Sequence, residues 1–229
     1  MRDDAGVIDR NADAFGAALV DYLEGRDVPE LALEALGGGV GPAMHPEWFF
    51  RQFEQWEWLD QQLLPLIGQG PVLDLGAGAG RASLYLQERG LSVTAVDASP
   101  GAVKVCQLRG VADVRLGDVN DPPDDRRWAG VLLLCGNLGL GGSWEGNRTL
   151  LARLSELCAP GTVLVGDSVT PDGPAQVTLR IRYRDLVTPW WTQYNIPATE
   201  MSDMVKGTGW QLETHLQAGE DHAVLLRRG

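Results

Sequence analysis

Residues 72–80 read VLDLGAGAG, and this segment constrains the possible fold more than any other part of the chain. A short apolar run passes directly into three glycines at alternate positions, and a helical pattern begins at residue 79. Glycine permits both a tight turn and the close approach of a ligand to the backbone. Free N–H groups at the start of the helix can donate to that ligand. The segment therefore predicts a strand, a ligand-binding loop and a helix in direct succession.

Short apolar runs and helical stretches alternate from residue 71 to the end of the chain. The candidate strands are 71–75, 92–97, 113–117, 130–135, 162–167, 210–216 and 222–228, and the candidate helices are 79–89, 100–109, 147–158 and 198–207. Nearly all-apolar strands are typical of a parallel sheet that is buried on both faces. The alternation predicts a doubly wound, Rossmann-like α/β fold with seven strands. Only residues 217–221 separate the last two strands, so the sheet is expected to end in an antiparallel pair.

The first 69 residues have a helical pattern of their own. Helices are expected over 9–24, 29–36 and 46–67, and Pro46 suits the first turn of the third. We expect an N-terminal helical cap over residues 1–69. The core is expected over 70–229, with a substrate-facing insertion at about 170–197.

Charge and cysteine content exclude several classes of function. The net charge of −12 argues against a nucleic-acid-binding surface, which needs a basic stripe, and against an anionic membrane partner. No apolar run approaches the roughly 20 residues of a membrane span, and the first residues, MRDD, lack the apolar core of a signal peptide. Three widely spaced cysteines fit neither a disulfide framework nor a zinc site. We therefore expect a cytoplasmic protein with reduced thiols, no metal and a small-molecule partner; the oligomeric state stays open.

Acidic residues follow the strands at places where a nucleoside ligand would need them. Asp97 ends the second candidate strand about 20 residues after the loop, where a carboxylate can accept hydrogen bonds from both ribose hydroxyls. Asp118 follows the third strand, where a carboxylate can accept a hydrogen bond from an adenine amino group. Asp74 directly precedes the glycines and would repel a pyrophosphate. Together with the G-x-G-x-G spacing, it favours a ligand with a cationic amino group and no phosphate, such as S-adenosylmethionine.

These motifs resemble those of the class I S-adenosylmethionine-dependent methyltransferases, in order and at successive strand ends, over about residues 70–229. The resemblance implies S-adenosylmethionine as methyl donor and S-adenosylhomocysteine as product, with the first 70 residues as a variable cap. It implies that Asp74, Gly76, Ala77, Gly78 and Gly80 hold the methionine part, that Asp97 and Ala98 hold the ribose, that Gly117, Asp118 and Val119 frame the adenine, and that Cys135, Gly136, Asn137 and Leu138 lie beside the sulfonium.

Methylation of a small, natural-product-like molecule is the function that these features favour. The adenine-amino methyltransferases carry Asp/Asn-Pro-Pro-aromatic after the fourth strand, where this chain has CGNL at 135–138. The sequence DPPD at 121–124 precedes that strand and reads as a turn. Three alternatives remain open. They are a protein or peptide methyltransferase, a catalytically silent S-adenosylmethionine-binding module, and a nicotinamide oxidoreductase, against which the glycine spacing speaks.

Residues 177–184 alternate between apolar or hydroxyl side chains and arginine. The arginine face could bind an anionic acceptor, although a solvated edge strand protected by charge is the favoured interpretation. The two adjacent tryptophans that follow suggest a lid or an aromatic pocket, with ordinary packing equally favoured. The candidate acceptor-binding residues are Phe49, Arg182, Trp190, Trp191 and Tyr194.

Candidate catalytic residues are few, because a base is needed only if the acceptor must lose a proton. His45 is the preferred candidate, since it begins the helix that is expected to close over the acceptor. Asp167, at the end of the fifth strand, and Tyr183 are the other candidates, followed by Tyr194.

Overall fold

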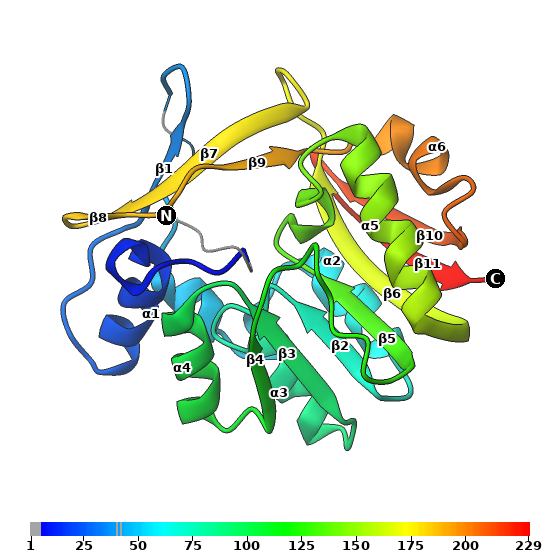
Figure 1. Cartoon of the computed structure of the whole chain (residues 1–229), viewed down its shortest axis with the longest axis horizontal. Coiled ribbons are helices and arrows are strands. Elements are labelled where there is room, and N and C mark those ends of the chain that lie inside the picture. Colours follow the sequence, from blue (N-terminus) through cyan, green and yellow to red (C-terminus); the bar gives the residue numbers. More distant parts are fainter. Residues whose placement is uncertain (1–5, 40, 42) are drawn as a thin grey trace.

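The larger of two sheets forms the centre of the molecule in a computed structural model that describes residues 6–39, 41 and 43–229 (Figure 1). Its strand order is β10-β11-β6-β5-β2-β3-β4. The strands are β2 (Val72–Leu75), β3 (Val93–Asp97), β4 (Asp113–Leu116), β5 (Trp128–Leu133), β6 (Cys158–Val169), β10 (Trp210–Ala218) and β11 (Asp221–Arg228). Strands β2 to β6 run parallel, whereas β11 pairs antiparallel with both β6 and β10. The predicted seven-stranded, doubly wound sheet with an antiparallel end is confirmed.

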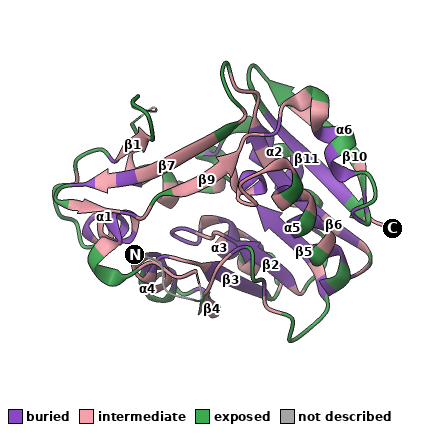
Figure 2. Cartoon of the chain, turned by 45° about the horizontal axis from the view of Figure 1, so that its top comes forward, coloured by how far each residue is buried: buried purple, intermediate pink, exposed green. Residues whose placement is uncertain are grey.

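Helices cover both faces of this sheet, which explains why its central strands are largely apolar. One face carries α2 (Trp58–Leu63), α3 (Arg81–Glu88) and α4 (Pro100–Arg109), and the other carries α5 (Trp144–Leu157) and α6 (Met201–Val205). All four residues of β2 are buried, and Figure 2 shows the same for most of β5 and β11. Within the described residues, no helix is long and apolar enough to cross a membrane.

The smaller sheet combines part of the N-terminal segment with the insertion after β6. It contains β1 (Ala32–Ala35), β7 (Gln176–Tyr183), β8 (Leu186–Val187) and β9 (Trp191–Tyr194). We call it the second sheet. Helix α1 (Ala14–Leu23) packs against its inner face, through apolar side chains of both elements. In Figure 1 the long strand β7 extends from β1 at one end of the molecule towards the main sheet.

Two expectations about these segments were wrong. The helix expected over 29–36 is instead strand β1, because its residues pair with β7 and Glu34 forms ion pairs with two arginines of that strand. Strand β7 is not an edge strand, since β1 lies on one side of it and β8 and β9 on the other. The arginine side chains of β7 therefore do not protect an open sheet edge, contrary to the favoured interpretation.

The helix expected over 46–67 is broken into four short pieces. Three are 3₁₀ turns, Pro46–Phe50, Phe53–Gln55 and Leu64–Leu66, and the fourth is α2. Arg51 and Trp56 are extended, with ψ of 146° and 167°. At these breaks side-chain hydrogen bonds replace helical backbone bonds: the Trp56 indole donates to the Arg51 carbonyl, and Gln61 donates to the Phe53 carbonyl. Large aromatic groups can thus face the core from a segment that is not one helix.

Candidate functional site

The glycine loop joins β2 to α3 as the sequence predicts. Gly76, Gly78 and Gly80 all have positive φ, of 78°, 58° and 76°, which other residues adopt only with strain. An ideal Cβ on Gly76 would lie 2.2 Å from Nδ2 of Asn137, so the loop also needs glycine for close packing. The three glycines themselves present no side chain between the loop backbone and a ligand.

Asp97, the last residue of β3, is hydrogen-bonded to this loop. Its Oδ2 accepts from the Gly78 N–H at 2.8 Å, and its Oδ1 accepts from the Ser99 N–H at 2.9 Å. Burial raises the pKa of Asp97 to about 6, and the nearby charges of Asp13 and Asp74 act in the same direction. A carboxylate oxygen has further lone pairs, so both can still accept hydrogen bonds from a diol.

Asp74 lies beneath the loop, 3% exposed, in the middle of β2. Its Oδ2 accepts a 2.7 Å hydrogen bond from the Ser83 hydroxyl in the first turn of α3. Burial raises its pKa to about 6, although the Ser83 hydrogen bond opposes this shift. The structure thus places Asp74 where it fixes α3 to β2 and contributes a negative field under the loop.

The adenine-side residues lie next to the first described residues of the chain. An ideal Cβ on Gly6 would be 2.1 Å from Oδ2 of Asp118, and the Ile8 N–H donates to the Ala98 carbonyl at 2.9 Å. Val119, next to Asp118, is 8% exposed. The N-terminal segment therefore lies directly against the ends of β3 and β4.

The loop after β5 is tied to the glycine loop and to β6. Asn137 donates from its side chain to the Leu75 and Gly76 carbonyls at 3.0 and 3.1 Å. Asp167 accepts from the N–H groups of Cys135 and Gly136, at 3.0 and 2.6 Å. Cys135 has a φ of 60°, unusual for a residue with a side chain. The two loops are thereby held at one edge of the sheet, together with a carboxylate.

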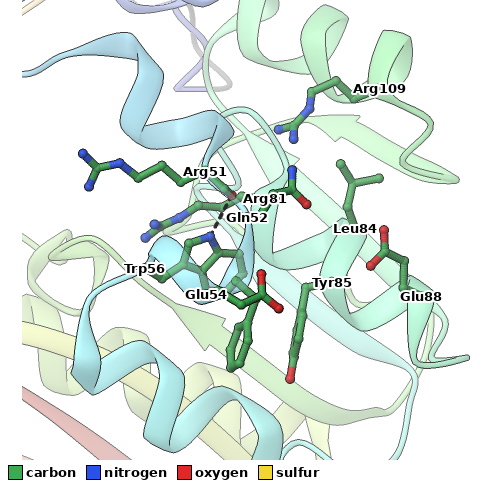
Figure 3. Close-up of a pocket in the computed structure, with 10 residues that line it drawn as sticks. Arg51, Gln52, Glu54, Trp56, Arg81, Leu84, Tyr85, Glu88 and Arg109 are labelled. Carbon is green, nitrogen blue, oxygen red and sulfur yellow. Dashed lines mark hydrogen bonds between the residues drawn. The ribbon is translucent and has the colours of Figure 1, made fainter.

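Asp167 belongs to a cluster of charged side chains. Arg81 contacts Oδ2 of Asp60 at 3.0 Å and Sγ of Cys135 at 3.4 Å. Its guanidinium carbon lies 4.8 Å from the centre of the Trp56 ring, and Figure 3 shows the two side by side in a pocket between the cap and α3. Burial raises the pKa of Asp167 to about 7, and the charge of Asp60 adds to the shift.

Two aromatic rings from the cap cover the glycine loop. Ring atoms of Phe49 and Phe15 lie 3.4 and 3.8 Å from an ideal Cβ on Gly78, and the rings contact each other edge to face with centroids 5.0 Å apart. Phe49 was a sequence candidate. Phe15 was not, because its position reads only as an apolar position of a helix.

The second sheet covers the loop after β5. Trp191 and Gln193 lie on one face of β9. The apolar side chains of β7 lie on the same face of the second sheet. An ideal Cβ on Gly136 would lie 3.0 Å from Nε2 of Gln193, and one on Gly139 would lie 2.5 Å from the carbonyl oxygen of Tyr194. No sequence signal distinguished Gln193, because a glutamine in a short strand has no characteristic spacing.

The other candidate acceptor residues face away from Trp191. Arg182 forms an ion pair with Glu34, and Trp190, 38% exposed, lies under the guanidinium of Arg180 at 4.5 Å. The ring of Tyr194 contacts Trp144, and its hydroxyl lies 3.2 Å from Glu200. Phe49 lies on the glycine loop and Trp191 packs with apolar side chains of α1 and β7, whereas these three residues lie on the opposite face of the second sheet.

The three candidate catalytic residues lie in different environments. His45 precedes the 3₁₀ turn that carries Phe49; its Nδ1 is buried, has no hydrogen-bond partner among the described residues, and lies 3.9 Å from Glu47. Tyr183 is 2% exposed, and its hydroxyl donates to Asp21 at 2.8 Å, on the side of α1. Asp167 alone contacts a loop of the site directly.

The chain is similar to known methyltransferases. A family model described as "Methyltransferase domain" matches residues 72–161, which span β2 to the first part of β6. No curated protein sequence matches the chain.

Solved structures extend this similarity to the whole chain. A SAM-dependent methyltransferase from Bacteroides fragilis, in complex with S-adenosyl-L-homocysteine, has 25% identity and a TM-score of 0.86, over 97% of this chain and 98% of its own. The CcbJ methyltransferase from Streptomyces caelestis has 15% identity and a TM-score of 0.59, over 80% of this chain and 98% of its own. CalS10, an amino pentose methyltransferase from Micromonospora echinaspora, has 14% identity and a TM-score of 0.55, over 77% of this chain and 94% of its own.

Proposed function

Since this chain belongs to the class I S-adenosylmethionine-dependent methyltransferases, we propose that it methylates a small, natural-product-like molecule. The observation that supports a small acceptor is the cover over the loops at the sheet edge. Cap rings lie on Gly78, the Gln193 side chain of β9 lies on Gly136, and the backbone of β9 lies on Gly139. A protein or peptide acceptor needs an open groove at this edge. CalS10, which shares the fold, is involved in calicheamicin biosynthesis.

The residues at the strand ends suit the proposed cofactor in both geometry and charge. S-adenosylmethionine supplies an electrophilic methyl group on a sulfonium. We assign the ribose to Asp97, whose carboxylate retains free lone pairs, and the adenine to the turn at Asp118 and Val119. The methionine part is assigned to the glycine loop, above the negative charge of Asp74. The sulfonium is assigned to the loop at 135–138, which Asn137 ties to the glycine loop under the cap rings, since cations are favourable over a π face.

The acceptor is assigned to the region bordered by the glycine loop with Phe49, by the loop after β5 and by the face of β9 that carries Trp191 and Gln193. There the chain excludes water and aligns the acceptor with the methyl group, which accounts for most of the rate of such a displacement. We propose His45 or Asp167 as the group that takes the acceptor's proton. Nδ1 of His45 has no hydrogen-bond partner in the described part of the chain, and the Asp167 pKa of about 7 suits proton exchange near neutral pH. Tyr183 is not proposed, because its hydroxyl is already bonded to Asp21.

The test has two steps. Isothermal titration with S-adenosylhomocysteine, with NAD as control, is expected to give micromolar binding of the former alone. A screen with labelled methyl donor then compares small amines, alcohols and phenols with peptides and whole-cell protein. Label in a small molecule supports the proposal, whereas label only in protein assigns the chain to the protein methyltransferases. No binding of S-adenosylhomocysteine by folded protein would overturn the assignment of the cofactor site.

A further inference from the structure

Helix α1 approaches the N-terminus of α4 so closely that their backbones touch. An ideal Cβ on Gly101 would lie 2.5 Å from the carbonyl carbon of Gly16, and one on Gly16 would lie 2.7 Å from Cα of Gly101. Side-chain atoms essentially never approach backbone this closely, so both positions need glycine. This contact brings the start of α1 next to the residues that follow β3, where the ribose is assigned.

Asp13 lies at this contact and is 4% exposed. It caps its own helix by accepting from the Gly16 N–H at 2.9 Å. It also accepts from the Ser99 hydroxyl, at 2.8 and 2.9 Å to its two oxygens, and from the Gly101 N–H at 2.8 Å. Three donors from two helix N-termini therefore stabilise one buried carboxylate. Removing it would leave all three without this acceptor.

Ser99 links Asp13 to the proposed ribose site. Its hydroxyl donates to Asp13, while its backbone N–H donates to Oδ1 of Asp97 at 2.9 Å. On either side of Asp13, Ile8 is hydrogen-bonded to the Ala98 carbonyl and the Phe15 ring lies on Gly78. The N-terminal segment thus contacts both the loop after β3 and the glycine loop, with Asp13 in the middle of these contacts.

We propose that Asp13 is a positioning residue for the cofactor: its hydrogen bonds to Ser99 and Gly101 hold Asp97 in place and hold α1 closed over the loops. Cofactor exchange then requires these bonds to open. The inference rests on the assignment of the ribose to Asp97. It makes the N-terminal segment part of the cofactor site, in addition to its contribution to the acceptor site.

The test compares two carboxylates of the same helix. Asp13→Asn keeps the size of the side chain but puts an N–H₂ group against the donors of α4. Asp21→Asn is the matched control, since Asp21 anchors the other end of α1 to Tyr183, away from the loops. Stopped-flow displacement measures release of S-adenosylhomocysteine, titration measures its Kd, and thermal melting measures stability.

We expect Asp13→Asn to raise the Kd about tenfold, the change expected when a buried hydrogen-bond partner worth about 1.4 kcal/mol is lost. The increase should come mainly from faster release, and kcat at saturating cofactor should change less than twofold. Asp21→Asn should lower the melting temperature and leave the Kd within twofold. If Asp13→Asn does not fold, Ser99→Ala, which removes the hydroxyl that donates to Asp13 and accepts from the Ala102 N–H, should show the same faster release to a smaller extent.

The outcomes separate this inference from the proposed function. If the wild type binds S-adenosylhomocysteine and Asp97→Ala abolishes binding, but folded Asp13→Asn releases it at the wild-type rate, the role of Asp13 is refuted and the site stands. Equal increases of the Kd in Asp13→Asn and Asp21→Asn also refute it, because they indicate general loosening of α1. Absence of binding in the wild type contradicts the site itself.

Discussion

The backbone N–H of Gly78 donates a 2.8 Å hydrogen bond to Oδ2 of Asp97. This contact joins the loop after β2 to the end of β3, so the groups assigned to the methionine part and to the ribose have a fixed distance without any ligand. Preorganisation of this kind reduces the entropy lost on binding. It also places the Asp97 carboxyl where burial opposes its ionisation, and this has consequences for pH.

Affinity for S-adenosylhomocysteine should rise with pH and level off above pH 7. The pKa of Asp97 is about 6 in the folded protein, and only its ionised form offers two acceptor oxygens without a proton to the two ribose hydroxyls. Binding at pH 5 must therefore displace a proton, which weakens the affinity about tenfold relative to pH 7. Titration at pH 5, 6 and 7.5 in buffers of different ionisation enthalpy measures both the affinity and the proton release.

Two variants separate the carboxyls that contribute. Asp97→Asn should bind weakly at every pH, whereas Asp74→Asn should retain the part of the pH dependence that belongs to Asp97. The stability of the ligand-free protein should change with pH in the opposite direction to the affinity. The raised pKa of Asp97 means that its contribution to the stability of the ligand-free protein is complete below about pH 4 and is lost as the pH rises through 6. A pH-independent affinity would contradict the assignment of Asp97.

Replacement of His45 by alanine should lower turnover and leave cofactor affinity unchanged. Loss of a general base reduces the rate by roughly a hundredfold or more. Tyr183→Phe is the control: it removes a hydroxyl that is bonded to Asp21, so it should lower the free energy of unfolding by about 1 kcal/mol with turnover retained. Steady-state kinetics with the identified acceptor and denaturant titration measure the two effects. Full activity of His45→Ala would leave Asp167 as the candidate.

Removal of the Arg81 charge should destabilise the protein more than removal of the whole ion pair. Arg81 and Asp60 are 13% and 5% exposed at their side chains, and Arg81→Met leaves Asp60 and Asp167 without their cation. Breaking a buried pair in this way costs about 3 kcal/mol or more. The double variant Arg81→Met/Asp60→Leu should recover most of that loss. Chemical denaturation of the three proteins gives the comparison, and equal stability of single and double variants would rule out an uncompensated charge.

Contact between the second sheet and the loop after β5 can be tested at Gly139. Its Cβ would lie 2.5 Å from the Tyr194 carbonyl oxygen, so Gly139→Ala must displace β9 or the loop. Overpacking of this kind costs about 1–3 kcal/mol, and the displaced Trp191 should raise the acceptor KM. Gly173→Ala is the control, because nothing lies within 4 Å of its Cβ. Equal effects of the two substitutions on KM would place the acceptor elsewhere.

The main sheet was predictable because its signals are local. Each strand end carries its motif within a few residues, as at Gly76 or Asp97, and the apolar β-branched runs identify the strands between them. Ala32–Ala35 was not predictable in this way. Its sequence, ALEA, consists of good helix formers, and pairing with β7 overrides that preference.

The sequence predicts that the loops after the parallel strands lie together, as the structure shows, but it does not predict the contacts that the cap makes with them. Ser99 and Asp13 are 86 residues apart, and Gln193 reaches Gly136 from another sheet. Such contacts have no periodicity that a sequence could display. The charged face of β7 was likewise misjudged, because the partner of Arg182 is Glu34, in a segment that reads as helical.

The pairing of Ala32 with Arg182 has a consequence for redesign. The surface assigned to the acceptor is assembled from two stretches of chain that flank the cofactor core in sequence, one before β2 and one after β6. A chimera that imports only the later stretch from another enzyme would leave β7 without its first neighbour and Glu34 without its arginines. New acceptor preferences should therefore be grafted as a matched pair of segments, with residues 70–169 and 198–229, which build the main sheet and helices α3 to α6, left unchanged.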